Sequence, residues 1–140
     1  MTIRPFSVAL GGMLAMAAVM GIGRFVYTPI LPYMTDALSL TKSDAGLIAA
    51  ANYLGYLVGA LAGATGIVAG NRRHWMLWGI AISAATTAAM AVTGSAYLFM
   101  VLRFIGGVAS ALYMVFGSAL VFERLAAAGR SDLCYVFFAG

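Results

Sequence analysis

The chain has 140 residues, of which 64% are hydrophobic and only 9% are charged, and its formal net charge is +4. A soluble domain carries about 25% charged residues, so this composition cannot form a water-facing surface and indicates an integral membrane protein. No basic patch interleaved with aromatic residues accompanies the positive charge, which argues against nucleic acid as a partner. The fold class that we predict is therefore all-α, a polytopic bundle of membrane helices.

Four apolar segments have about the length that spans a bilayer as a helix, near 20 residues. In chain order they cover residues 6–34, 44–68, 75–93 and 97–122, and a fifth apolar run covers residues 133–140. The connection between the third and the fourth segment is so short that these helices must be antiparallel neighbours. Because the fifth run stops after a few residues, we expect residues 1–140 to be a partial N-terminal transmembrane domain, from a fragment or a truncated reading frame.

The first segment contains Arg24, and Pro29 and Pro32 follow it closely. A lone charge in lipid costs roughly 3 kcal/mol on insertion scales, and prolines leave backbone groups that something else must satisfy. We therefore expect this helix to face the protein interior or a water-filled cavity. The alternative is that Arg24 extends along the helix to the outer headgroups.

The fourth segment contains Arg103, followed by Gly106 and Gly107. At a rise of 1.5 Å per residue, Arg24 lies about 25 Å above the cytoplasmic end of its helix, and Arg103 about 9 Å below the outer end of its own. Both depths fall in the outer half of a core about 30 Å thick, so we expect both guanidiniums to face one outward-opening cavity. Since no acid lies in the middle of a segment, their expected partners are anionic solute groups, helix carbonyls, or acids on parts of the protein outside these 140 residues. Arg103 has the same headgroup alternative as Arg24.

The second segment carries polar residues and a ladder of glycines. Asn52 and Tyr56 are four residues apart and share a helix face, where Asn52 either hydrogen-bonds a solute or a neighbouring helix. Gly55, Gly59 and Gly63 have the spacing that lets another helix backbone approach closely. We therefore expect a bundle held by close helix contacts, with a polar cluster beside them.

The basic residues are distributed unequally between the two ends of the predicted bundle. One end receives only Lys42, and the other receives five arginines: Arg4, Arg72, Arg73, Arg124 and Arg130. The positive-inside rule then predicts a cytoplasmic N-terminus and a cytoplasmic 70–74 loop. Asp44, at the outer end, is either a helix-capping acid, with Thr41 or Ser43 as the cap, or an acid that takes part in coupling.

The sequence lacks the residue patterns that catalysis requires. Cys134 is the only cysteine and His74 the only histidine, and no metal-ligand spacing or nucleophile–base pair is present. We therefore expect neither an enzyme nor a bound cofactor.

Two stretches resemble the major facilitator superfamily. Arg103-Phe-Ile-Gly-Gly-Val-Ala-Ser-Ala111 is similar to the pattern of its fourth helix, and Gly63, Gly70 and Arg72-Arg73 match part of its loop between helices two and three. In that loop Ile67 replaces the family's gating aspartate. Gly21-Ile-Gly-Arg-Phe-Val-Tyr-Thr-Pro-Ile-Leu-Pro and Ala51-Asn-Tyr-Leu-Gly-Tyr-Leu-Val-Gly resemble, more specifically, the YbfB/YjiJ-like branch of bacterial transporters.

The resemblance implies twelve helices in two halves, with a solute site between them at mid-membrane. It implies a secondary active transporter of a small solute in the bacterial inner membrane, with protons as a candidate coupling ion and Arg103 as the arginine involved in coupling. The paired arginines favour an anionic solute. The residues expected to line the path are Arg24, Asn52, Tyr56 and Arg103, and those expected in gating or coupling are Asp44, Arg72 and Arg73. The alternative is a small four-helix scaffold whose glycine ladder serves oligomerisation.

Overall fold

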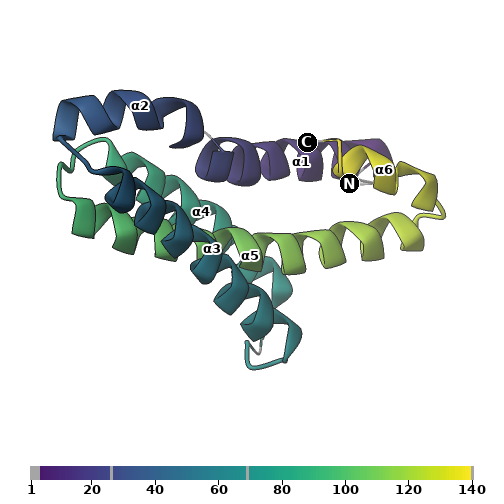
Figure 1. Cartoon of the computed structure of the whole chain (residues 1–140). Coiled ribbons are helices and arrows are strands. Elements are labelled where there is room, and N and C mark those ends of the chain that lie inside the picture. The colour runs from purple at the N-terminus through teal and green to yellow at the C-terminus, as the bar shows by residue number, and fades with distance from the viewer. Residues whose placement is uncertain (1–3, 26, 69, 140) are drawn as a thin grey trace.

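The computed structural model describes residues 4–25, 27–68 and 70–139, and this part of the chain is built from helices and short turns without a strand (Figure 1). The predicted all-α class is confirmed. Residue 26 of the Gly21–Pro32 motif and residue 140 of the fifth apolar run lie outside the described residues. In chain order the elements are α1 (Pro5–Met16), the π-helix η1 (Ala17–Phe25), α2 (Tyr27–Leu38), α3 (Lys42–Ala64), α4 (Arg72–Met90), α5 (Ala96–Ala127), the 3₁₀ turn η2 (Ser131–Leu133) and α6 (Cys134–Phe137).

Three helical stretches of the described chain are long and apolar enough to cross a membrane. They are Pro5–Leu38, Lys42–Ala64 and Ala96–Ala127. The predicted third span forms α4, a helix of 19 residues that begins with Arg72, Arg73 and His74. Because these polar residues occupy its first turn, α4 is not among the three stretches.

The start of α3 is set by a capping box. The Thr41 hydroxyl accepts a hydrogen bond from the Asp44 N–H at 3.1 Å, and the Asp44 carboxylate accepts one from the Thr41 N–H at 3.0 Å. Of the two caps considered, Thr41 is the one used, and the helix begins at Lys42, two residues before the predicted start. The helix ends at Ala64, four residues before the predicted end, because Gly66 adopts a φ of +71° that continues no helix.

The long helix α5 extends five residues past its predicted end and closes with a Schellman motif. Gly129 adopts a φ of +66°, the Arg130 N–H donates to the Leu125 carbonyl at 2.9 Å, and the Gly129 N–H donates to the Ala126 carbonyl at 3.0 Å. These bonds satisfy carbonyls that the helix end would otherwise leave open. The additional turn of α5 then leads directly into η2 and α6.

The glycine ladder of α3 packs against α5, which confirms the predicted close helix contact. A methyl group added at Gly55 would collide with the Phe104 carbonyl, and one added at Gly59 would lie 2.7 Å from the Val108 carbonyl. On the facing helix, a methyl at Gly107 would collide with the Asn52 carbonyl. The two backbones are therefore in direct contact, and α5 forms its most extensive interface with α3.

The first helical stretch, made of α1, η1 and α2, runs along another side of α5 (Figure 1). At one end a buried cluster joins α1 and η1 to α5 and α6, so the two chain ends lie near each other in Figure 1. At the other end Tyr27, Ile48 and Phe99 form a second buried cluster that joins α2, α3 and α5. The end of the π-helix η1 lies between these two clusters, at the same level as Arg24 and Arg103.

Candidate functional site

The first helical stretch changes its winding at the predicted site. Residues Ala17–Phe25 form a π-helix, and the α-helix resumes at Tyr27. π-Helical turns are rare and are frequently found at functional sites. Pro29 follows within the next turn and has no N–H with which to pair a carbonyl of the preceding turn. The sequence did not predict this π-helix, for which a Gly–x–Gly–Arg stretch shortly before a proline was the available signal.

Arg103 binds the backbone at the point where the winding changes. Its Nη1 donates to the Gly23 carbonyl at 2.9 Å, and its Nη2 donates to the Arg24 carbonyl at 3.0 Å. Its guanidinium also lies over the ring of Tyr27, 4.4 Å from the centroid. Only 6% of the residue is exposed, so Arg103 points into the bundle and not away from it. Helix carbonyls were among the partners expected for the arginines, and they are the groups that bind Arg103.

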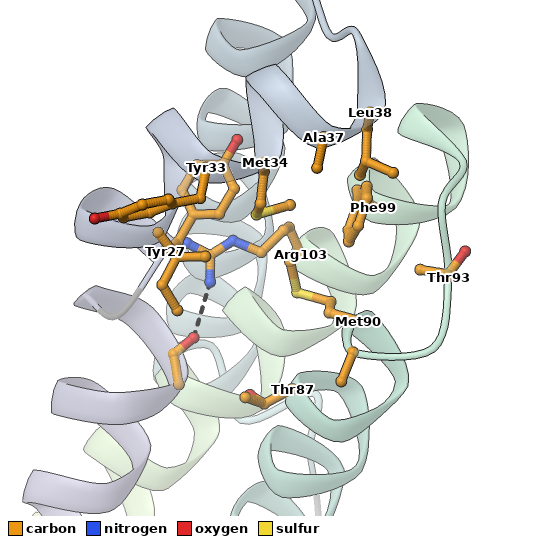
Figure 2. A pocket seen from close by; sticks show the side chains of 13 residues that line it. Tyr27, Tyr33, Met34, Ala37, Leu38, Thr87, Met90, Thr93, Phe99 and Arg103 are labelled. Atoms are coloured by element: carbon orange, nitrogen blue, oxygen red, sulfur yellow. Dashed lines mark hydrogen bonds between the residues drawn. The ribbon is translucent and has the colours of Figure 1, made fainter.

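A cavity of about 470 Å³ lies beside Arg103 (Figure 2). It is bordered by α2, the end of α4 and the start of α5, and Figure 2 shows the Arg103 side chain directed toward Tyr27, with Met90, Phe99 and Leu38 on the side away from Tyr27. Its volume falls within the range of small-molecule sites, which are mostly apolar with a few placed polar groups. Arg103 is the one charged residue among the residues that line it.

Arg24 has surroundings of its own, on the side of the π-helix that faces α3. Its guanidinium lies 4.5 Å from the ring centroid of Tyr56, 5.1 Å from that of Tyr53 and 5.7 Å from that of Phe25. Arg24 is half-buried, and it is not among the residues that line the 470 Å³ cavity. The structure thus brings Arg24 and Arg103 together through the Arg24 carbonyl but gives their guanidiniums separate environments.

Asn52 and Tyr56 both lie where α3 meets α5. Asn52 is 4% exposed, and its backbone carbonyl and the Tyr56 backbone nitrogen both face Gly107. The ring of Tyr56 lies against Arg24, as does the ring of Tyr53. The sequence placed Tyr53 in one polar cluster with Asn52 and Tyr56 but not on the expected path, and it gave Tyr27 little weight because an aromatic residue in a membrane helix is usually a packing residue. Tyr53 lies three residues before Tyr56, and Tyr27 lies four residues after Gly23. These helical spacings were the available signal.

The residues expected in gating or coupling do not gather at one place. Asp44 belongs to the capping box at the start of α3. Arg72 lies at the start of α4, beyond the other end of α3, and its Nη1 is 3.4 Å from a Glu123 carboxylate oxygen in an exposed ion pair. Arg73 lines a second cavity, of about 380 Å³, together with Arg124. Because α3 runs on to Ala64, about 30 Å of helix separates Asp44 from the end at which Arg72 and Arg73 follow.

The described residues contain no group of three or more histidine, cysteine or acidic side chains that could hold a metal ion. The described part of the site presents guanidinium groups, tyrosine rings and backbone carbonyls. Of these groups, the guanidinium is the one whose N–H donors suit an anion.

Comparisons with known proteins identify the family. A family model described as "Uncharacterised MFS-type transporter YbfB" matches residues 16–140. No curated protein and no solved structure gave a match. The matched range contains the π-helix, both arginines and all of α3, α4 and α5. The chain therefore belongs to the YbfB-like family of major facilitator transporters, whose members move small solutes across a lipid bilayer.

Proposed function

We propose that this chain forms part of a secondary active transporter for a small anionic solute. The observation that carries the proposal is that two cations, Arg24 of the first helical stretch and Arg103 of α5, lie at the same level of the bundle. Among the described residues, neither Arg24 nor Arg103 forms a salt bridge. The Arg24 guanidinium lies against aromatic rings, and the Arg103 guanidinium lies against one ring and two backbone carbonyls. Two positive charges within an apolar bundle, without a carboxylate beside them, favour a negatively charged ligand.

The path that we propose is lined by Arg24, Asn52, Tyr56 and Arg103. The change from π- to α-helix between Phe25 and Tyr27 supports a role in conformational change, because such interruptions let a membrane helix bend. Protons are the coupling ion that we propose, and the arginine-rich 70–74 loop is the end that we place in the cytoplasm of a bacterial cell.

The scaffold alternative depends on the glycine ladder of α3 being free to bind other copies. Gly55, Gly59 and Gly63 all pack against α5 within the same chain. This intramolecular contact occupies the surface that oligomerisation would use, and it favours the transporter.

The proposal is tested by expressing the encoding gene from its start codon to its stop codon and measuring uptake of labelled carboxylates into membrane vesicles. We expect Arg24→Ala and Arg103→Ala to abolish uptake, and Arg130→Ala to leave it unchanged, because Arg130 pairs with Asp132 at the surface. Expression and monodispersity of each variant are checked by fluorescence-detected gel filtration. Uptake that is unchanged in both Arg24→Ala and Arg103→Ala would remove the site assignment.

A further inference from the structure

We infer that Arg24, Tyr53 and Tyr56 form a binding site for an organic monocarboxylate, and that Arg103 is a positioning residue. This inference rests on the proposed function and divides the work between the two arginines. It also adds Tyr53, which the sequence did not single out as a path residue. The argument begins with the hydrogen-bond donors that each guanidinium has left to offer.

Arg103 has committed both of its terminal nitrogens to the backbone. Each of them donates to a carbonyl of the first helical stretch, and its Nε is buried without a partner among the described residues. Each terminal nitrogen keeps one further N–H, so a ligand that took the two hydrogen-bonded N–H groups would have to displace those carbonyls. The fork-shaped donor set of Arg103 therefore serves the protein itself, by fixing the place where the π-helix ends.

Arg24 has the opposite arrangement. None of its nitrogens forms a hydrogen bond within the described part of the chain, and only its Nε is buried. Its Nη1 and Nη2 thus remain accessible and unpaired. Two parallel N–H donors on one planar cation match the two oxygens of a carboxylate.

The tyrosines hold this cation in place. Tyr53 and Tyr56 are three residues apart on α3, so their rings lie on one face of the helix, and both lie within cation–π distance of the guanidinium. The adjacent face of α3 carries Gly55 and Gly59 against α5, so the tyrosines lie beside this helix contact. Aromatic faces attract a cation without consuming its N–H groups, so the rings orient Arg24 and leave its donors free.

The open part of Tyr53 indicates the rest of the ligand. Tyr53 is 59% exposed although Arg24 approaches its ring. The remaining ring surface is apolar and lies next to the free donors, where it can stack with an organic body. A single guanidinium with two free donors suits one carboxylate better than a doubly charged phosphate, which needs more donors. The site therefore favours a carboxylate that carries an apolar or aromatic group.

The same π-helical segment produces both arrangements. It turns the Arg24 side chain towards α3 while the carbonyls of Gly23 and Arg24 face Arg103 on α5. Arg103 then acts on the ligand through Arg24, by holding the backbone that carries it.

The test uses phenylglyoxal, which modifies accessible arginines, on the full chain in lipid nanodiscs. The modification rate at each arginine is measured by mass spectrometry of its peptide, with sodium benzoate or its neutral counterpart benzamide present. We expect benzoate to slow modification of Arg24 about tenfold, because the two charge-assisted hydrogen bonds to its carboxylate must break before the guanidinium can react. We expect benzamide to have no effect. Arg130 serves as the exposed control at which neither compound changes the rate, and Arg103 is expected to react slowly throughout.

Variants of α3 separate the site from a general effect of the anion. Tyr53→Ala is expected to remove the protection by benzoate, Tyr53→Phe to keep it, and Leu54→Ala, an equally exposed neighbour on the same helix, to keep it. Equal protection by benzamide, protection at Arg103 in place of Arg24, or no protection at Arg24 would each overturn the inference. Protection without solute uptake by the same gene would remove the transport function and leave the binding site. Uptake without protection at Arg24 would remove the binding site and leave transport.

Discussion

Arg103 and Tyr27 form a buried stack in which the guanidinium lies 4.4 Å from the ring centroid. The Tyr27 hydroxyl continues the connection by donating to the Ala45 carbonyl of α3 at 3.3 Å. One arginine and one tyrosine therefore link α5, α2 and α3 at the level of the cavity. Any movement of α2 relative to α3 and α5 has to change these contacts, which gives Arg103 a structural role.

The first prediction concerns the stability that Arg103 provides. Arg103→Met leaves the carbonyls of Gly23 and Arg24 without their donors, and each unsatisfied group costs about 1–3 kcal/mol, partly offset because a buried charge is also removed. We expect a net destabilisation of about 2 kcal/mol, measured by thermal unfolding in detergent. Arg103→Lys should be intermediate, because an ammonium group cannot reproduce the two parallel bonds.

A matched control for this measurement is Arg72→Ala. Arg72 pairs with Glu123 at 3.4 Å, but both side chains are more than half exposed, and such pairs contribute about 0–1 kcal/mol. Arg72→Ala should therefore unfold close to the unmodified chain. If Arg103→Met unfolded at the same temperature as Arg72→Ala, the tie between α5 and the π-helix would carry no stability.

The second prediction compares two glycines of the same helix. At Gly55 an added methyl would collide with the Phe104 carbonyl, whereas at Gly46 it would meet nothing within 4 Å. Gly55→Ala forces two backbones apart and should cost about 1–3 kcal/mol, the usual range for overpacking. Gly46→Ala should instead stabilise the helix by about 0.5–1 kcal/mol, because alanine is the better helix former. Unfolding of both variants in the same detergent checks the sign of each effect, and equal effects would contradict the packing of α3 on α5.

The glycine ladder also shows what could be predicted from the sequence. Gly55, Gly59 and Gly63 are four residues apart and therefore lie on one face of their helix. The close helix contact was predictable for this reason, although the partner helix was not. The sequence likewise offered Thr41 as one of two candidate caps and Asp44 as a helix-capping acid, because both residues act within one turn of chain, and the structure joins them in a capping box. Features that depend on local spacing were accessible to sequence reasoning.

The surroundings of the two arginines were less accessible. Depth along a helix placed Arg24 and Arg103 at similar levels, and the hydrogen bond between Arg103 and the Arg24 carbonyl agrees with that. The direction of each side chain depends on the π-helix, which changes the rotation of every residue after it. Because π-helical winding has no strong sequence signature, a single shared cavity for both guanidiniums was expected, and separate environments were found.

The third prediction tests the contact between the π-helix and α4. A methyl at Gly23 would lie 2.6 Å from the Ser83 hydroxyl oxygen, and Ser83 is buried, with 4% exposed. Gly23→Ala should therefore destabilise the protein by about 1–2 kcal/mol. Ser83→Ala removes the clashing oxygen, so the double variant should recover most of that loss. A double-mutant cycle in unfolding free energy measures this coupling, and simple additivity of the two changes would show that the residues do not meet.

The fourth prediction decides between the two roles of Asp44. Its carboxylate accepts hydrogen bonds from the Thr41 N–H at 3.0 Å and from the Thr41 hydroxyl at 2.7 Å, so the structure gives it a complete role as part of the capping box. Asp44→Asn keeps a side-chain oxygen that can accept the Thr41 N–H, but it removes the group that takes up and releases a proton. We expect uptake into vesicles to keep its dependence on an imposed pH gradient in Asp44→Asn.

Thr41→Ala is the matched variant for that experiment, since it removes the cap and keeps the acid. We expect it to reduce the stability of α3 without changing the pH profile of uptake. If Asp44 is the coupling acid instead, Asp44→Asn abolishes the dependence on the pH gradient while Thr41→Ala preserves it, because a neutral amide cannot exchange protons whatever the state of the helix end. The two roles thus predict opposite results for the same substitution, and the variant that leaves the carboxylate in place shows whether a loss of uptake comes from proton exchange or from fraying of α3.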